Sequence, residues 1–175
     1  GEDTIARARE SAAALRALIE RLEQSGVLRP GQAQRRQQGA ASAQAKALPY
    51  RTFTSRSGLT ILVGKGGKHN DALSLRVARG NDLWLHARDW AGAHVVVRLG
   101  KGQHLDQETL LDAALLAAHH SKGRGDTLID VQYTHAKHVR KPKGLPPGRV
   151  TVADGKNIAV RPDPERLTRL NHTRV

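Results

Sequence analysis

The chain has 175 residues, a formal net charge of +13 and neither cysteine nor methionine. Without cysteine and without a run of about 18 apolar residues, a disulfide framework and a membrane-spanning helix are both excluded. This length suits one domain with appendages, and the positive charge favours polyanionic partners, nucleic acid before an anionic membrane surface. No secretory signal segment is recognisable, so we expect a reducing, cytoplasmic location and no membrane partner.

Residues 1–27 are predicted to form a helix that ends a coiled coil. Apolar residues recur at alternating intervals of three and four, as in a coiled-coil seam, at Ile5, Ala8, Ala12, Leu15, Ile19 and Leu22. Because so short a helix is marginal alone, we expect a partner helix, in an upstream region or in a second chain. Docking of the helix on its own domain is the alternative.

Residues 28–49 are rich in Gln, Ala, Gly and Arg and lack hydrophobic periodicity. We predict a basic flexible linker there, or a basic arm that becomes ordered on binding.

Residues 50–162 are predicted to form an α+β domain with a small mixed or antiparallel sheet of hairpins, packed with two helices. One hairpin is expected to pair 51–55 with 59–63, and a terminal hairpin to pair 149–152 with 157–160.

Two helix starts are indicated by capping residues. Asn70 or Asp71 is expected to cap a short helix, and Asp106 a longer one that runs to about Ser121. Lys122-Gly123-Arg124-Gly125 is expected to end this longer helix and to supply a glycine for its cap. Residues 163–175 are predicted to form a C-terminal tail with one or two helical turns.

The segment from Asn81 to Val97 is the one around which we expect the domain to be organised. Its two ends alternate in polarity or are β-branched, which is typical of short strands. Between them lie turn residues, and both tryptophans of the chain fall within these positions. We interpret the segment as the structural centre of the domain and as one wall of its binding surface.

Three residues of this segment, His86, Asp89 and His94, raise the possibility of a zinc or manganese site. The two histidines are predicted to lie on different strands, so we expect no metal and no cofactor there. Asp89 is expected to accept backbone N–H bonds in its turn. With no activated nucleophile recognisable, we predict that the chain is not an enzyme, and a metal- or nucleotide-dependent hydrolase that uses these three residues is the alternative.

Two basic loops are predicted to contact phosphates. The glycine-rich loop after the first hairpin carries Lys65 and Lys68 but lacks the spacing of a nucleotide-binding P-loop. The second loop is stiffened by prolines and carries Lys137, Arg140, Lys141, Lys143 and Arg149. Because aromatic residues are few, we expect recognition of RNA shape and phosphate rather than stacking on splayed bases.

Several stretches resemble the NFACT-R domain, the C-terminal RNA-binding domain of the NFACT family of ribosome quality-control proteins. The first stretch is Asn81-Asp82-Leu83-Trp84-Leu85-His86-Ala87-Arg88-Asp89, followed by Gly92-x-His94-Val95-Val96-Val97. The others are Gly64-Lys65 with His69-Asn70-Asp71, and Val139-Arg140-Lys141-Pro142-Lys143-Gly144 with Pro147-Gly148. Ala93 departs from the family pattern, because many relatives have Ser there.

The resemblance implies binding to tRNA and to RNA of the large ribosomal subunit, where stalled nascent chains are tailed for degradation. The residues that it carries over for RNA binding are Lys65, Lys68, His86, Arg88, Asp89, His94 and the loop from Lys137 to Arg149. Tailing itself is not implied, because the family's Asp-Arg pair for that reaction belongs to an N-terminal domain absent from these residues. A stand-alone NFACT-R protein of RNA metabolism is an alternative. A surface adhesin, suggested by an older family name, is disfavoured because no signal segment is recognisable.

Overall fold

The computed structural model describes residues 2–25 and 48–175, which belong to two compact units, 1–47 and 48–175. In the first unit, helix α1 (Glu2–Gln24) confirms the predicted helix, and its seam residues Ile5 and Leu15 are about half exposed. The partner helix remains a prediction, and the predicted linker lies almost wholly outside the described residues. Among the described helices, none combines the length and apolarity that crossing a membrane requires.

The second unit is built on a six-stranded antiparallel sheet with the order β1-β2-β4-β3-β5-β8. Its strands are β1 (Tyr50–Thr54), β2 (Thr60–Gly64), β3 (Leu83–Ala87), β4 (Val95–Val97), β5 (Ile129–His135) and β8 (Lys156–Val160). The pairing of β1 with β2 confirms the first predicted hairpin. Together with the helices, the sheet confirms the predicted α+β class.

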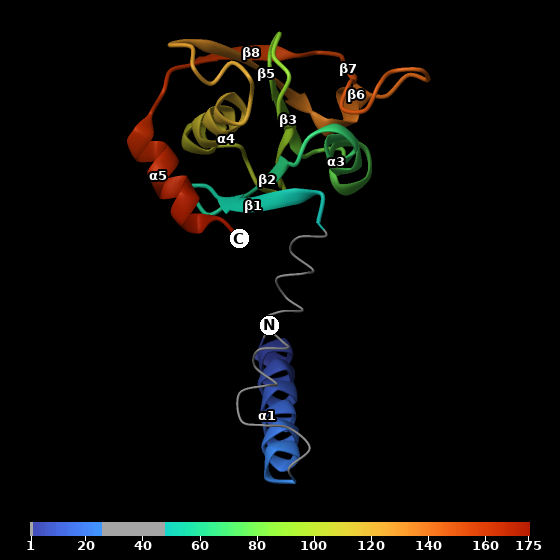
Figure 1. The fold of residues 1–175 in the computed structure, drawn as a ribbon, viewed down its shortest axis with the longest axis vertical. Helices are drawn as coiled ribbons and strands as arrows, with labels where there is room; N and C mark the ends of the chain where they lie inside the picture. The colour runs from blue at the N-terminus through green and yellow to red at the C-terminus, as the bar shows by residue number, and fades with distance from the viewer. Residues whose placement is uncertain (1, 26–47) are drawn as a thin grey trace. The chain divides into compact units, whose positions relative to one another are not determined.

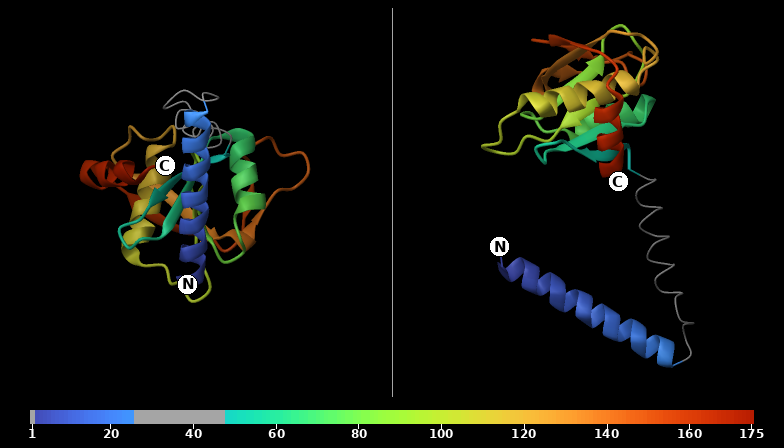
Figure 2. Two further views of the ribbon diagram at one scale, coloured as in Figure 1. Left: turned by 90° about the horizontal axis from the view of Figure 1, so that it is seen from below. Right: turned by 90° about the vertical axis from the view of Figure 1, so that its left-hand side faces the viewer.

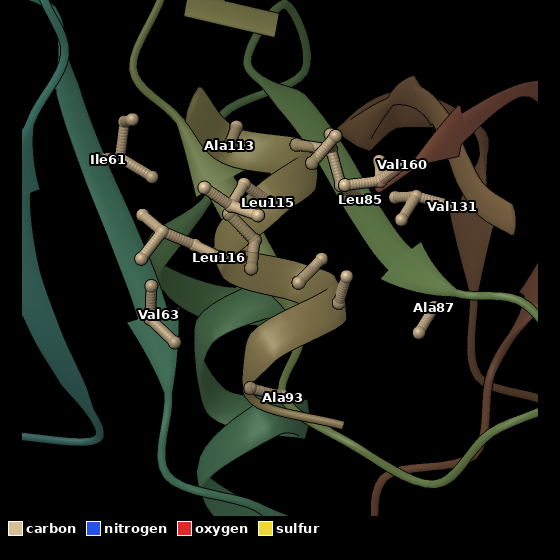
Figure 3. Close-up of a cluster of buried hydrophobic side chains, with 14 of the residues drawn as sticks. Ile61, Val63, Leu85, Ala87, Ala93, Ala113, Leu115, Leu116, Val131 and Val160 are labelled. Carbon is tan, nitrogen blue, oxygen red and sulfur yellow. The ribbon is translucent and has the colours of Figure 1, made fainter. Parts of the chain in front are cut away.

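Alternation along the central strands gives the sheet two apolar faces, because successive side chains of a strand point to opposite sides. On β3, for example, Leu83 and Leu85 join the larger core while Trp84 joins the smaller core on the other face. The larger core receives helix α4 (Gln107–His119), around which the sheet curves (Figures 1 and 3). Four alanines of α4 are buried against the sheet and bring the two backbones close together.

The opposite face is covered by α3 (Gly67–Ala72), which continues as the π-helical turn η1 (Leu73–Val77). A small second sheet pairs β6 (Val139–Arg140) with β7 (Thr151–Val152), after the 3-10 turn η2 (Ala136–His138). Leu62, Leu73, Trp84, Val96 and Val139 form the smaller core between these parts. The loop from β6 to β7 projects beside α3, as Figure 2 shows.

Helix α5 (Pro164–Thr173) lies within the segment predicted as a C-terminal tail and packs on α4 and β1. Its Leu170 is fully buried. The buried carboxylate of Asp112 on α4 accepts hydrogen bonds from Arg166 at 2.7 Å and from Arg169 at 2.6 Å. Since both arginines belong to α5, this ion pairing fastens the helix to the core.

Two local predictions are wrong. The predicted terminal hairpin does not form, because β7 pairs with β6 while β8 pairs with β5 in the main sheet. The short helix begins at Gly67, after Gly66, so neither Asn70 nor Asp71 caps it. By contrast, Asp106 caps α4 as expected, since its side chain accepts a hydrogen bond from the Thr109 N–H. That helix ends at His119, slightly earlier than expected.

Candidate nucleic-acid interface

An open cleft of about 1210 Å³ lies where four segments of the second unit meet. These segments are the glycine-rich loop after β2, the turn between β3 and β4, the residues that end α4, and the end of the loop from β6 to β7. The cleft therefore joins the predicted central segment to both of the predicted phosphate-contacting loops.

Asn70 ties the glycine-rich loop to the turn. Its buried amide donates to the Gly92 carbonyl at 3.0 Å and accepts from the backbone N–H of His94 at 3.1 Å and of Gly66 at 3.3 Å. A Cβ on Gly64 would lie 2.2 Å from the Asn70 side-chain oxygen. Only glycine leaves room at that position for the amide that fixes this wall of the cleft.

His94 links the sheet to the second basic loop through a chain of buried hydrogen bonds. Trp84 Nε1 donates to the Ser74 hydroxyl at 2.9 Å, and this hydroxyl donates to His94 Nδ1 at 2.6 Å. His94 Nε2 lies 3.0 Å from the Gly148 carbonyl, which accepts only, so Nε2 carries the proton. Burial, with a smaller contribution from neighbouring His86, lowers the pKa of His94 to about 4, and the ring is neutral at pH 7.

Asp71 and Lys141 also hold the loop from β6 to β7, through contacts with Pro146, Gly148 and Arg149. The Asp71 carboxylate accepts from the Gly148 N–H at 3.1 Å and forms a salt bridge of 3.2 Å with Lys141. Lys141 Nζ also donates to the carbonyls of Pro146 and Arg149. Its three protons thus have three acceptors within the domain, which makes Lys141 a brace of the loop. Gly148 itself has φ +81°, a left-handed conformation that favours glycine.

The turn after β3 is joined to the residues that end α4. The Lys122 N–H donates to the Ala91 carbonyl at 2.8 Å, and the Ala93 N–H donates to the His120 carbonyl at 3.1 Å. Gly92 lies between these two bonds and pairs with Ser121, where a Cβ on Gly92 would come within 2.7 Å of the Ser121 Cα. These contacts place the turn after β3 beside the residues that follow α4, and both segments line the cleft.

The cleft is strongly cationic. Among the described residues that line it, one is acidic, Asp89, and five are basic: Arg51, Lys65, Lys122, Arg124 and Arg149. Burial lowers the pKa of His86, although a backbone hydrogen bond at Gly92 opposes the shift. Burial and adjacent cations lower the pKa of His120 to about 4. These histidines are therefore neutral at pH 7, and the charge of the cleft comes from Lys and Arg.

The structure brings some of the predicted binding residues together and separates others. Lys65, His86, Asp89 and Arg149 line the cleft. Lys68, Arg88, Arg140 and Lys143 are exposed outside it, and Lys141 is engaged as a brace. Lys137 lies at the opposite end of β3, because its N–H bonds to the Gly80 carbonyl.

Sequence reasoning missed Arg51, Trp90, Lys122 and Arg124 as lining residues. In the sequence, cations after a helix are accounted for by the negative end of the helix dipole, and no local pattern indicates that Lys122 and Arg124 face the glycine-rich loop. Gly123, one of the two glycines that could supply the helix cap, is buried against Trp90, and His120 occupies the cap position.

The arrangement does not favour the alternative of a hydrolase. The ring centroids of His86 and His94 are 5.2 Å apart, but both ring nitrogens of His94 already have hydrogen-bond partners. Within residues 2–25 and 48–175, no three His, Cys, Asp or Glu side chains gather closely enough to hold a metal ion.

Comparison with known proteins gives a consistent result. Residues 49–154 match the family described as "NFACT protein RNA binding domain". The chain is 42% identical to the Rqc2 homolog RqcH of Bacillus subtilis over 119 residues, which are 68% of this chain and 20% of that protein. It is 28% identical to coiled-coil domain-containing protein 25 of Bos taurus over 135 residues, 70% of this chain and 64% of that protein.

Among solved structures, the C-terminal part of the fibronectin/fibrinogen-binding protein of Streptococcus suis matches with a TM-score of 0.64. The identity is 34%, and the match covers 72% of this chain and 49% of that one. The chain thus spans about a fifth of the length of the bacterial RqcH relatives and about half of the matched structure.

Proposed function

Because the chain belongs to the NFACT protein RNA binding domain family, we propose that it binds RNA through the cationic cleft. The observation that carries this proposal is the convergence of Arg51, Lys65, Lys122, Arg124 and Arg149 on one concavity that contains a single described acid. Clustered cations bind a phosphate backbone because they replace its condensed counterions, and a concave site lets several of them act on one strand.

The partners that we propose are tRNA and RNA of the large ribosomal subunit, in quality control of stalled nascent chains. Support comes from the bacterial relatives, which are named as Rqc2 homologs. The chain would contribute binding rather than catalysis to such a pathway. Its alternative as a stand-alone RNA-binding protein is supported by coiled-coil domain-containing protein 25, most of which the chain covers.

Charge reversal in the cleft tests the binding proposal. We expect Lys122→Glu combined with Arg124→Glu to weaken tRNA binding and to reduce the slope of log affinity against log salt by about 2 units, because two phosphate contacts are lost. Both side chains are exposed, so the fold should survive. The measurement is tRNA binding at several salt concentrations, with a duplex DNA of equal charge beside it.

The matched control is Arg76→Glu with Arg161→Glu, which changes the net charge equally at exposed positions outside the cleft. This variant should retain most of the affinity and the slope. An equal loss in both variants would mean that the overall charge, rather than the cleft, attracts RNA. Equal affinity of the unaltered chain for tRNA and for duplex DNA would argue against an RNA-specific site.

A further inference from the structure

We infer that the cleft takes an unpaired nucleotide whose base stacks on Trp90, so that single-stranded or splayed RNA binds better than an uninterrupted duplex. This inference rests on the proposed function, because it specifies which RNA the same cleft accepts. It also goes beyond the expectation from composition, in which the few aromatic residues left only shape and phosphate to be recognised.

The exposure of Trp90 is the first observation. Its side chain is 38% exposed, whereas Trp84 is 1% exposed. A single exposed apolar side chain is common on protein surfaces, but Trp90 lines a cleft in which five Lys or Arg side chains converge. Aromatic rings beside a cationic groove are the combination used by single-strand binding sites, because the base stacks while the cations follow the backbone.

The support beneath the ring is the second observation. A Cβ added at Gly123 would lie 2.6 Å from Trp90 Cε2 and 2.7 Å from both Cδ2 and Nε1. Gly123 is buried, and the indole packs so closely on its main chain that no side chain would fit at this position. The backbone thus supports the ring from one side, and we assign the exposed part of Trp90, which lines the cleft, to the ligand.

The ring is held in place before any ligand binds. On one side of Trp90, Asp89 has φ +62°, a conformation that Asp adopts more readily than most residues. On the other side, the Ala91 carbonyl accepts from the Lys122 N–H at 2.8 Å. A platform fixed in this way loses little conformational freedom when a base stacks on it.

The geometry favours an unpaired base over a base pair. In a duplex both faces of each internal base are already stacked, so a protein ring reaches them only after unstacking. The cleft of about 1210 Å³ exceeds the 300–1,000 Å³ typical of small-molecule pockets, which leaves room for one nucleotide and its flanking phosphates. Lys122 and Arg124 flank Gly123 in sequence and place cations beside the stacked base.

The test compares a short single-stranded oligoadenylate with a blunt-ended RNA duplex on the full chain. We expect Trp90→Ala to weaken oligoadenylate binding roughly 5- to 150-fold, the range for loss of one base–aromatic stack, with little change for the duplex. Trp90→Tyr should retain most of the affinity, because the aromatic face is kept. Oligoadenylate should also alter the tryptophan fluorescence of the unaltered chain, and Trp90→Phe, which keeps only buried Trp84, should abolish that change.

Equal losses for oligoadenylate and duplex in Trp90→Ala, or a Trp90→Tyr variant as weak as Trp90→Ala, would overturn the inference. So would unchanged fluorescence at saturating oligoadenylate. The outcome is separable from that of the proposed function. If Lys122→Glu with Arg124→Glu weakens binding while Trp90→Ala does not, the cleft binds RNA without stacking. If neither variant matters, RNA binds elsewhere.

Discussion

At the scale of single residues, the most informative side chains are those whose hydrogen bonds position the cleft. Asn70, His94 and Lys141 each lie in a stretch that resembles the RNA-binding family, and each is engaged with backbone groups of the cleft walls. His94 was expected to contact RNA, but it is 1% exposed and acts on the site by holding the Gly148 carbonyl. We therefore expect removal of such a residue to affect RNA binding through the shape of the loop rather than through a lost contact.

His94 also makes stability depend on pH. Because folding lowers its pKa from 6.5 to about 4, the unfolded chain takes up a proton in this interval while the folded chain does not. Stability should therefore be fully present above pH 6.5 and fall as pH decreases towards 4, by about 1.4 kcal/mol per pH unit for this residue.

Urea unfolding between these pH values, on the unaltered chain and on His94→Gln, checks the expectation. The variant should lose about 1–3 kcal/mol at pH 7, since its buried partners are left poorly satisfied, and should show a shallower pH dependence. His104→Gln, at an exposed position, is the control. If His94→Gln kept the full pH dependence, other histidines of the domain, such as His120, would be its source.

At the scale of elements, α5 shows how charge attaches a helix to a core. Its apolar contribution includes one fully buried residue, Leu170, and its other main contact is the pairing of two arginines with Asp112. Asp112 also accepts the Arg56 N–H at 2.9 Å, so one carboxylate joins α4, α5 and the turn between β1 and β2. A buried carboxylate with several donors is costly to remove, because it leaves opposite charges unpaired.

We therefore expect Asp112→Asn to lower the free energy of unfolding by about 3 kcal/mol, the low end for a broken buried pair, because both arginines are partly exposed. Hydrogen exchange should accelerate most in α5. Glu165→Gln, at an exposed position on the same helix, should change stability by less than about 0.5 kcal/mol. Unchanged exchange in α5 of Asp112→Asn would show that its apolar contacts and the Arg166–Glu108 salt bridge are enough to hold the helix.

At the scale of the whole molecule, the sheet, both hydrophobic cores and the cleft all belong to residues 48–175. A unit with its own core is expected to fold independently. Residues 28–49 were predicted to form a basic linker or arm. Such an arm can contribute to RNA binding without contributing to the stability of the domain, so the two properties are measured separately.

A fragment of residues 48–175 should accordingly unfold in one cooperative transition, with a Tm within a few degrees of the full chain. A lower Tm would mean that residues 1–47 stabilise the domain. The tRNA affinity of the same fragment reports on the predicted arm: equal affinity would assign binding to the domain alone, and a weaker affinity with a smaller salt slope would assign phosphate contacts to the arm.

The amino-acid sequence by itself determined the class of fold and the elements whose signals are local. The hairpin signal predicted β1 and β2, alternation of side chains predicted β3, and the Asp106 cap predicted the start of α4. The motifs between Asn81 and Val97, with those of the two basic loops, indicated the family. These properties depend on residues within a few positions of each other, where backbone geometry and capping act.

Only the tertiary structure decided the pairing of β7 and β8 with different sheets and the composition of the cleft. Trp90 meets Gly123, and Asp71 meets Gly148, across long stretches of chain. Such contacts follow from the way the sheet curves and packs, and neither spacing nor charge in the sequence specifies them. Lys141 illustrates the same reason. The sequence predicted that it contacts phosphate, but in the fold it donates to Pro146, Arg149 and Asp71. These acceptors become its neighbours only when the loop from β6 to β7 packs beside α3.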